Sequence, residues 1–279
     1  MSRFLSALCC TAAMLAAVPA ASARSAGAFP SPSPSASAQV LQEEADDVDP
    51  APPIRSASVQ TFYTNASYGP GNVRVGQVIP RFDSLRIGDS YVRLSFPRYA
   101  WTDGGAYGIS DAQIIYLTSL SHGGSTRFAV GGTFYIPSAS SPQLGIGTWG
   151  LGPAAGLIHF DRVAGLATGF LLQSIFSFAG PSTRPKQRVV ALQPLVVKQL
   201  GAGWSLRSAD AQWATDFTRG STIVPVSLGI GKLFPVGAQV LNVVVADVVT
   251  VIHANAPAAP KNTWKLTIII MDPRRRLGP

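Results

Sequence analysis

The sequence predicts an all-β protein, an antiparallel transmembrane β-barrel of about twelve strands, and three observations support this. First, 47% of the residues are apolar and only 13% are charged, whereas soluble domains carry about 25% charged residues. Second, no apolar run beyond residue 23 approaches the roughly 20 residues that a helix needs to cross a bilayer. Third, apolar and polar residues alternate along many short segments, which is the period of a strand. Such a chain can cross a membrane by closing a sheet, because closure pairs every backbone group.

Residues 1–23 are predicted to be a cleaved secretory signal peptide. Arg3 provides the charged start, residues 4–18 the short apolar core, and residues 21–23 (ASA) the small-residue cleavage site. The core is too short to span a bilayer, and Pro19 argues against a buried helix. Export through this signal predicts that the mature protein lies in the outer membrane. Both cysteines fall in this segment, so the mature chain would hold none for disulfides or metals.

Two short regions are predicted to flank the barrel. Residues 24–53 run SPSPSASA, then acidic EEADDVDP, then APP, and bury too little apolar area to fold. We therefore expect a disordered Pro/Ser-rich and acidic extension there. Residues 273–279 form a basic C-terminal tail with three consecutive arginines. The barrel is predicted over residues 54–272.

Twelve segments rich in Val, Ile, Leu, Phe, Tyr and Thr follow one another, separated by Gly, Pro, Asp and Ser clusters. They lie near residues 54–64, 72–82, 88–99, 108–118, 125–136, 148–160, 164–178, 187–200, 203–213, 222–234, 238–252 and 263–271. An even number of strands is typical of bacterial outer-membrane barrels. It returns both chain ends to the same side, which we expect to be the periplasm.

The alternation within these segments gives each predicted strand a large apolar face and a polar or small face. In residues 263–271 the apolar face carries Trp264, Leu266, Ile268 and Ile270, and the other face carries Lys265 and Thr267. A secreted β-sandwich with a binding role would show the same alternation with its apolar face inward. The low charge, export and segment length favour the membrane barrel, where the apolar face meets lipid.

Aromatic residues and prolines have predicted positions along the strands. Aromatics near segment ends would form interfacial girdles, and they are Tyr99, Trp101, Trp149, Phe160, Trp204, Trp213, Phe234 and Trp264.

A proline removes one donor from a ladder. We therefore expect the prolines in or near strands to sit at strand ends or bulges, and they are Pro80, Pro97, Pro194 and Pro225.

Nucleic-acid, metal and cofactor sites are not predicted. The formal net charge is +8, but the basic residues are scattered, and recognition of nucleic acid needs a clustered basic face. Three histidines (His122, His159 and His253) leave little for a metal site. Residues 145–150 match G-x-G-x-x-G by letters, but Gly152 and Pro153 follow at once, so the helix of a dinucleotide site cannot begin.

A barrel enzyme acting on lipid is a second alternative, although we predict no enzymatic activity. The candidate bases are His159, beside Asp161, and His122, four residues before Thr126. Nucleophilic catalysis needs a base within reach of a hydroxyl and a third group that orients the base. The sequence shows no serine motif next to a histidine.

The polar, inward-facing residues are the predicted functional set of a channel. They are Arg74, Arg93, Asp111, Gln113, Arg127, Tyr135, Gln173, Gln193, Asp210, Gln212 and Asn242. A barrel of about twelve strands has a narrow interior, so these side chains either satisfy one another or line a path for a small solute. Their mixed charges predict weak ion selectivity, with Tyr135 as an aromatic contact.

An ordered series of motifs resembles the outer-membrane protein family labelled after the meta-pathway of phenol degradation. The motifs are residues 107–111 (YGISD), 149–154 (WGLGPA), 192–196 (LQPLV), 203–206 (GWSL), 224–232 (VPVSLGIGK) and 264–266 (WKL). The resemblance implies an outer-membrane barrel that transports small hydrophobic or aromatic compounds, and it supplies no catalytic residues. The expected partners are membrane lipid, outer-membrane lipopolysaccharide, a small-molecule solute and the barrel-insertion machinery.

Overall fold

The computed structural model describes residues 55–272 except 69–73, 88–89, 96–97, 104, 121–123, 143, 238 and 258. The predicted signal peptide, the extension over residues 24–53 and the basic tail over residues 273–279 lie outside the described residues. The described part forms β1 (Arg55–Ser67), β2 (Val75–Ile87), β3 (Ser90–Ser95), β4 (Tyr99–Thr102), β5 (Tyr107–Ile109), β6 (Ala112–Ser119), β7 (Thr126–Ile136), β8 (Trp149–Asp161), β9 (Leu166–Ala179), β10 (Arg188–Gly201), β11 (Trp204–Arg207), β12 (Trp213–Asp216), β13 (Ser221–Val236), β14 (Gln239–Ala254) and β15 (Pro260–Asp272).

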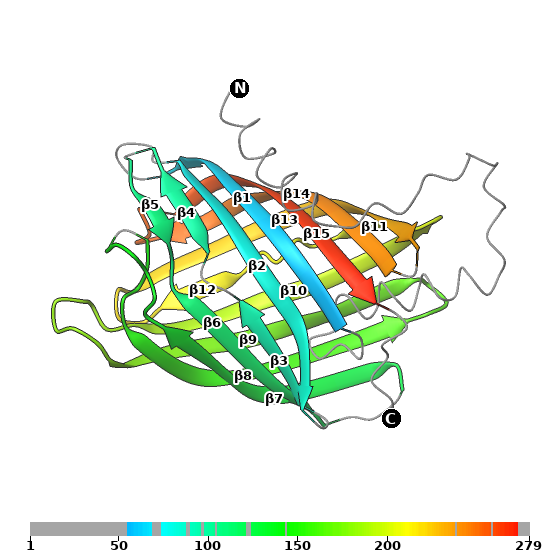
Figure 1. Cartoon of the computed structure of the whole chain (residues 1–279), viewed down its shortest axis with the longest axis horizontal. Helices are drawn as coiled ribbons and strands as arrows, with labels where there is room; N and C mark the ends of the chain where they lie inside the picture. The colour runs from blue at the N-terminus through cyan, green and yellow to red at the C-terminus, as the bar shows by residue number, and fades with distance from the viewer. Residues whose placement is uncertain are drawn as a thin grey trace. The chain divides into compact units, whose positions relative to one another are not determined.

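These elements make one closed antiparallel barrel (Figure 1). Closure occurs at β1, where Val59 pairs with Ile268 of β15 on one side and with Pro80 of β2 on the other. The fifteen elements make twelve strands of the barrel wall, called staves below. Three of these staves are interrupted and consist of two elements each, namely β3 with β4, β5 with β6, and β11 with β12. The predicted all-β barrel of about twelve strands is confirmed. Among the described residues, no helix is long and apolar enough to cross a membrane.

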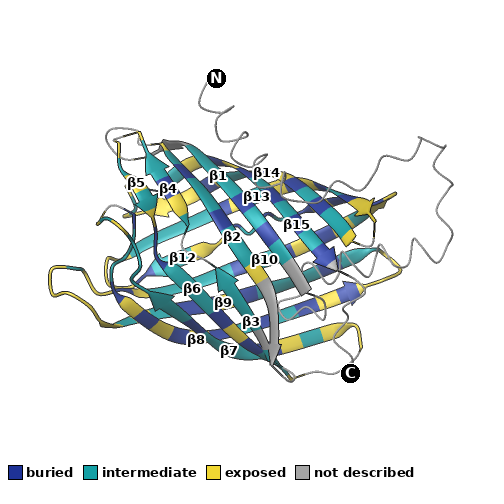
Figure 2. Cartoon of the chain, in the orientation of Figure 1, coloured by how far each residue is buried: buried dark blue, intermediate teal, exposed yellow. Residues whose placement is uncertain are grey.

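Many large apolar side chains of the barrel wall point outward, and the strands show alternating buried and exposed bands (Figure 2). In β13 the side chains of Val226, Leu228 and Ile230 are exposed, while Gly229 and Gly231, on either side of Ile230, are buried. β15 repeats this pattern, because Trp264 is exposed while Lys265 beside it is buried. A soluble β-sandwich would place the large side chains of these strands inside. The closed barrel therefore replaces the β-sandwich alternative.

The inner face is less polar than the alternation predicts. Three clusters of buried apolar side chains line it, and they are Ile115, Leu117, Ala129, Ala154 and Leu171; Ile158, Phe160, Ala167 and Val197; and Leu233, Ile269 and Met271. Phe160 belongs to this inner set, so its predicted place in an outer aromatic girdle is wrong. The reason is local, since Phe160 follows the inward Ile158 at a spacing of two in β8.

The two ends of the barrel differ in the length of their connections. At the end where β1 begins and β15 finishes, called here the terminal end, only two residues separate β10 from β11 and β13 from β14. At the opposite end, called here the loop end, residues 137–148 join β7 to β8 and residues 180–187 join β9 to β10. Short periplasmic turns and longer extracellular loops are typical of outer-membrane barrels.

Candidate functional site

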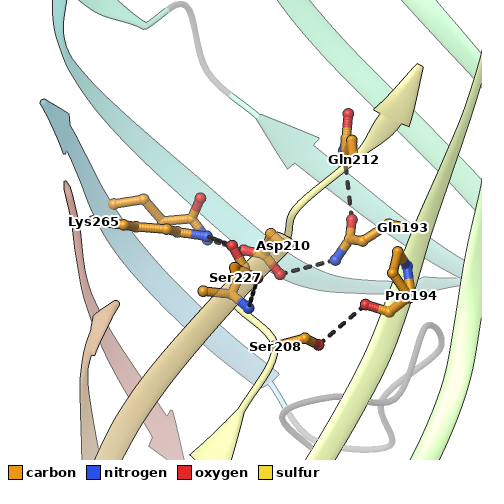
Figure 3. A network of polar contacts seen from close by, with 9 residues as sticks. Gln193, Pro194, Ser208, Asp210, Gln212, Ser227 and Lys265 are labelled. Atoms are coloured by element: carbon orange, nitrogen blue, oxygen red, sulfur yellow. Dashed lines mark hydrogen bonds and ion pairs between the residues drawn. The ribbon is translucent and has the colours of Figure 1, made fainter. Parts of the chain in front are cut away.

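An inward segment at mid-barrel, residues 208–212, forms the centre of the site. It lies between β11 and β12, where the stave departs from its neighbours β10 and β13. Side chains supply part of the bonding here, because Ser208 Oγ accepts from Val196 N at 3.0 Å and Ser227 Oγ accepts from Ala209 N at 2.8 Å, while Ser208 N donates to Val196 O at 2.8 Å. Asp210 has a φ of +50°, in the left-handed region that Asp tolerates better than most residues. The departure carries the Asp210 side chain into the lumen (Figure 3).

The Asp210 carboxylate is held by three side chains from three different strands. Gln193 Nε2 of β10 donates to Oδ1 at 2.8 Å, and Gln60 Nε2 of β1 donates to Oδ2 at 3.3 Å. Lys265 of β15 forms an ion pair with Oδ2, and its Nζ also donates to Ala209 O at 3.3 Å. The Lys265 side chain is only 3% exposed, so this ammonium relies on protein partners rather than water.

The network surrounds a cavity of about 70 Å³ in which basic residues outnumber acidic ones. Its charged lining residues are Arg81, Arg93, Arg207, Lys265 and Asp210. A space of that size holds only a few water molecules, and this part of the lumen is called the constriction below. The mixed charges of the predicted set suggested weak ion selectivity, whereas basic side chains outnumber acidic ones among the described residues that line this cavity.

One wall of the cavity is apolar and continues toward the terminal end. Leu171, Leu195, Val197 and Ile269 line the cavity itself. Val197 also packs with Ile158 and Phe160, and Ile269 packs with Met271 at the end of β15. A solute that passes the charged constriction therefore meets an apolar surface on its way to the terminal end.

The structure brings part of the predicted lining set together at the constriction. Arg93 lines the cavity, and Gln193 and Asp210 belong to the network. Gln212 joins them through its Nε2, which donates to Gln193 Oε1 at 3.4 Å (Figure 3). A separate amide pair links Gln113 Nε2 of β6 to Gln173 Oε1 of β9 at 2.9 Å.

The remaining members of the set lie elsewhere. Arg74 precedes β2 at the loop end, half exposed, with its Nε 3.7 Å from Asp103 Oδ2. Arg127, near the start of β7, has its guanidinium carbon 5.2 Å from the centre of the Phe160 ring. Tyr135 is partly buried in β7, and Asn242 in β14 is completely buried.

The Asp111 carboxylate binds backbone amides of a loop and is not among the residues that line the mid-barrel cavity. Its Oδ1 accepts from Ala139 N at 3.1 Å, and its Oδ2 accepts from Ile146 N at 2.5 Å and from Gly147 N at 3.1 Å. These amides belong to the connection of residues 137–148 between β7 and β8. The carboxylate is buried. It accepts hydrogen bonds from three loop N–H groups that have no strand ladder to pair with.

Sequence reasoning missed four residues of the site, namely Gln60, Arg81, Arg207 and Lys265. A signal was available for two of them. Lys265 stands between Trp264 and Leu266, and Arg207 follows Leu206, so each base alternates with outward apolar neighbours. A base in that pattern has to face the lumen if its neighbours face lipid. Asp210 itself belongs to the predicted set, although it lies in an irregular segment between β11 and β12.

The two histidines that the structure describes, His159 and His253, do not form a complete catalytic arrangement. His159 Nδ1 lies 2.8 Å from Thr126 Oγ1 on the exposed surface. Asp161 does not orient this histidine through Oδ1, which accepts from Val163 N and Ala164 N in the following turn. His253 stacks on Tyr68 with ring centroids 3.6 Å apart, and His122 lies outside the described residues.

Neither a metal cluster nor a dinucleotide motif is found in the part of the chain that the structure describes. No group of three or more potential metal-ligating residues gathers there. The glycine-containing residues 145–148 lie in the connection that leads into β8. A strand follows them, whereas a dinucleotide site requires a helix at that point.

Comparison with known proteins supports the fold. No family model matches the chain, and no curated protein matches it. Among solved structures, an outer-membrane channel from Pseudomonas putida F1 is 12% identical, with 81% of this chain and 97% of that chain covered and a TM-score of 0.57. The NanC porin is 7% identical, with 76% and 98% covered and a TM-score of 0.52. The chain thus has the fold of outer-membrane β-barrel channels.

Proposed function

We propose that this protein is an outer-membrane channel for small organic solutes. The observation that carries the proposal is the closed barrel with a cavity of about 70 Å³ at mid-barrel, where basic side chains outnumber acidic ones among the described lining residues. The outward Leu, Val and Ile side chains suit contact with membrane lipid. Such a channel lies among lipopolysaccharide and depends on the barrel-insertion machinery for assembly. The short turns of the terminal end support an orientation with both chain ends in the periplasm.

The lining suggests which solutes pass. The basic residues at the constriction attract anions, because a narrow low-dielectric passage focuses the field of its charges. The apolar clusters between the constriction and the terminal end favour solutes with a hydrophobic or aromatic body. This combination agrees with what the resemblance to the phenol-degradation family implies, namely the passage of hydrophobic or aromatic compounds. Small aromatic or hydrophobic solutes, and anionic ones above all, are therefore the proposed substrates.

Planar lipid bilayers test the proposal directly. We expect the refolded protein, shown to be folded by a heat-dependent gel shift, to insert and give discrete single-channel currents. Arg93→Ala removes a base that lines the cavity and should lower anion preference. Arg127→Ala, at the Phe160 ring near the terminal end, should change it less. Absence of currents from folded protein would contradict a channel, and equal effects of the two substitutions would contradict this lining.

A barrel enzyme acting on lipid is kept as a second candidate by one observation, the exposed Thr126–His159 pair. The pair places a hydroxyl within hydrogen-bond reach of a base, as nucleophilic catalysis requires. Release of fatty acid from phospholipid vesicles, measured for the unaltered protein and for His159→Ala, tests it. Activity that disappears with His159→Ala would favour the enzyme over the channel.

A further inference from the structure

We propose that the Asp210 carboxylate occupies a binding site for the carboxylate of a solute, which displaces it during passage. This inference deepens the proposed channel function and rests on it. The site is the mid-barrel wall made by Lys265, Gln60 and Gln193, and its ligands are small carboxylic acids with an apolar body. Asp210 then acts as an internal stand-in that closes the site while no solute is bound.

The three donor side chains and the Asp210 carboxylate that they bind stand on different kinds of backbone. The three donors to the carboxylate stand on strands of the wall: at Gln60 and Lys265 the strands β1 and β15 are paired on both sides, and at Gln193 the strand β10 is paired with β9. Asp210 stands on residues 208–212, where the ladder with β10 and β13 is interrupted, although Ser208 N still donates to Val196 O at 2.8 Å and Ala209 N to Ser227 Oγ at 2.8 Å. The donors are therefore fixed, whereas the carboxylate can leave without breaking a ladder.

The donor set is the one that a free carboxylate requires. One oxygen of Asp210 receives an amide N–H from Gln193, and the other receives an amide N–H from Gln60 and the Lys265 ammonium. Charge-assisted hydrogen bonds of this kind are about twice as strong as neutral ones. When Asp210 moves away, the buried Lys265 needs another anion, because an uncompensated buried charge is costly.

The other groups around the cavity specify the rest of the ligand. Arg81 and Arg93 line the same cavity as Lys265, so basic groups outnumber acidic ones among its described lining residues. Leu195, Val197 and Ile269 supply an apolar wall on which a ring or a short alkyl chain can lie. The site therefore fits a compact aromatic or aliphatic monocarboxylate better than an inorganic anion or a sugar.

Isothermal titration of the detergent-solubilised full-length protein with sodium benzoate tests this site, with benzamide as the neutral ligand of the same shape. We expect the unaltered protein to bind benzoate and not benzamide. Asp210→Asn removes the competing charge and keeps the side-chain shape, so it should bind benzoate several-fold more tightly. Asp216→Asn is the matched control, since Asp216 is bound to Arg219 outside the cavity and should leave benzoate affinity unchanged.

The outcomes separate this inference from the channel proposal. Equal binding of benzamide and benzoate to the unaltered protein would overturn the site, and this comparison does not depend on whether any variant folds. Unchanged benzoate affinity in Asp210→Asn that keeps its heat-dependent gel shift would overturn the role of Asp210. Benzoate binding by a protein that gives no current in bilayers would leave the site standing and overturn the channel.

Discussion

At the scale of single residues, Asp111 shows how one carboxylate orders a loop. It accepts backbone N–H groups from Ala139, Ile146 and Gly147, and Gly145 approaches it so closely that a side chain there would collide with its oxygens. Hydrogen bonds to a charged group contribute about 1.5–3 kcal/mol each. The connection between β7 and β8 therefore depends strongly on this one side chain.

Asp111→Ala should release that loop without unfolding the barrel, whose ladders do not involve the carboxylate. We expect limited proteolysis to cut within residues 137–148 much faster than in the unaltered protein. Asp103→Ala is the control, because the exposed Arg74–Asp103 pair contributes only about 0–1 kcal/mol. Equal cleavage rates in the two variants would show that Asp111 does not hold the loop.

Single residues also show how far the alternation of polar and apolar residues reaches. Arg93 alternates with Val92 and Leu94 in β3 and lies beside the cavity, and its role in a channel stays a prediction. Asp111 follows the same alternation but binds a loop, because its partners are more than 25 residues away in sequence. Alternation identifies which face a side chain takes, and it contains no information about partners on distant strands.

At the scale of elements, prolines mark the places where ladders are interrupted. Pro225 lies at a bulge opposite β14, as predicted. Pro80 and Pro194 lie inside β2 and β10 and not at their ends, so that part of the prediction is wrong. Each faces a gap between two elements of one stave, β3 and β4 for Pro80 and β11 and β12 for Pro194. No ladder donor is needed at a gap, but the gap itself cannot be seen in a sequence.

Two adjacent glycines in β7 give a test at this scale. A Cβ added at Gly131 would lie 1.8 Å from the Tyr116 carbonyl oxygen, whereas at Gly132 the nearest atom is 3.3 Å away. Gly131→Ala should therefore force β6 and β7 apart and lower stability far more than Gly132→Ala. Urea unfolding followed by tryptophan fluorescence in lipid vesicles measures the difference. Similar midpoints for both variants would argue against the close approach of these strands.

At the scale of the whole molecule, the outer face of the barrel is adapted to lipid. Leu172 lies near the middle of β9 and Leu200 near the terminal end of β10, and both side chains are substantially exposed. An arginine on the lipid face costs about 2–4 kcal/mol at the bilayer midplane and about 0–1 kcal/mol near an interface. Leu172→Arg should therefore destabilise the inserted barrel by about 2–4 kcal/mol and Leu200→Arg by much less, as measured by urea unfolding in vesicles. Equal losses would indicate that these residues are not at different depths in a membrane.

The overall architecture could be predicted from the sequence because every strand repeats the same period, and a closed sheet follows from an apolar chain without spanning helices. The constriction could not be predicted to the same extent. It depends on the departure of residues 208–212 from the wall and on Gln60, Gln193 and Lys265, which are far apart in the chain and meet only after closure. The apolar inner clusters likewise escape a pattern that assigns one polarity to each face.

The cationic constriction is the central claim of this account, and the reversal potential in a potassium chloride gradient across a planar bilayer tests it most directly. Because Arg81, Arg93, Arg207 and Lys265 outnumber Asp210 among the described residues that line the cavity, chloride should be more permeant than potassium. The reversal potential should therefore have the sign of an anion-selective channel. A reversal potential of the opposite sign from folded, inserted protein would contradict the account.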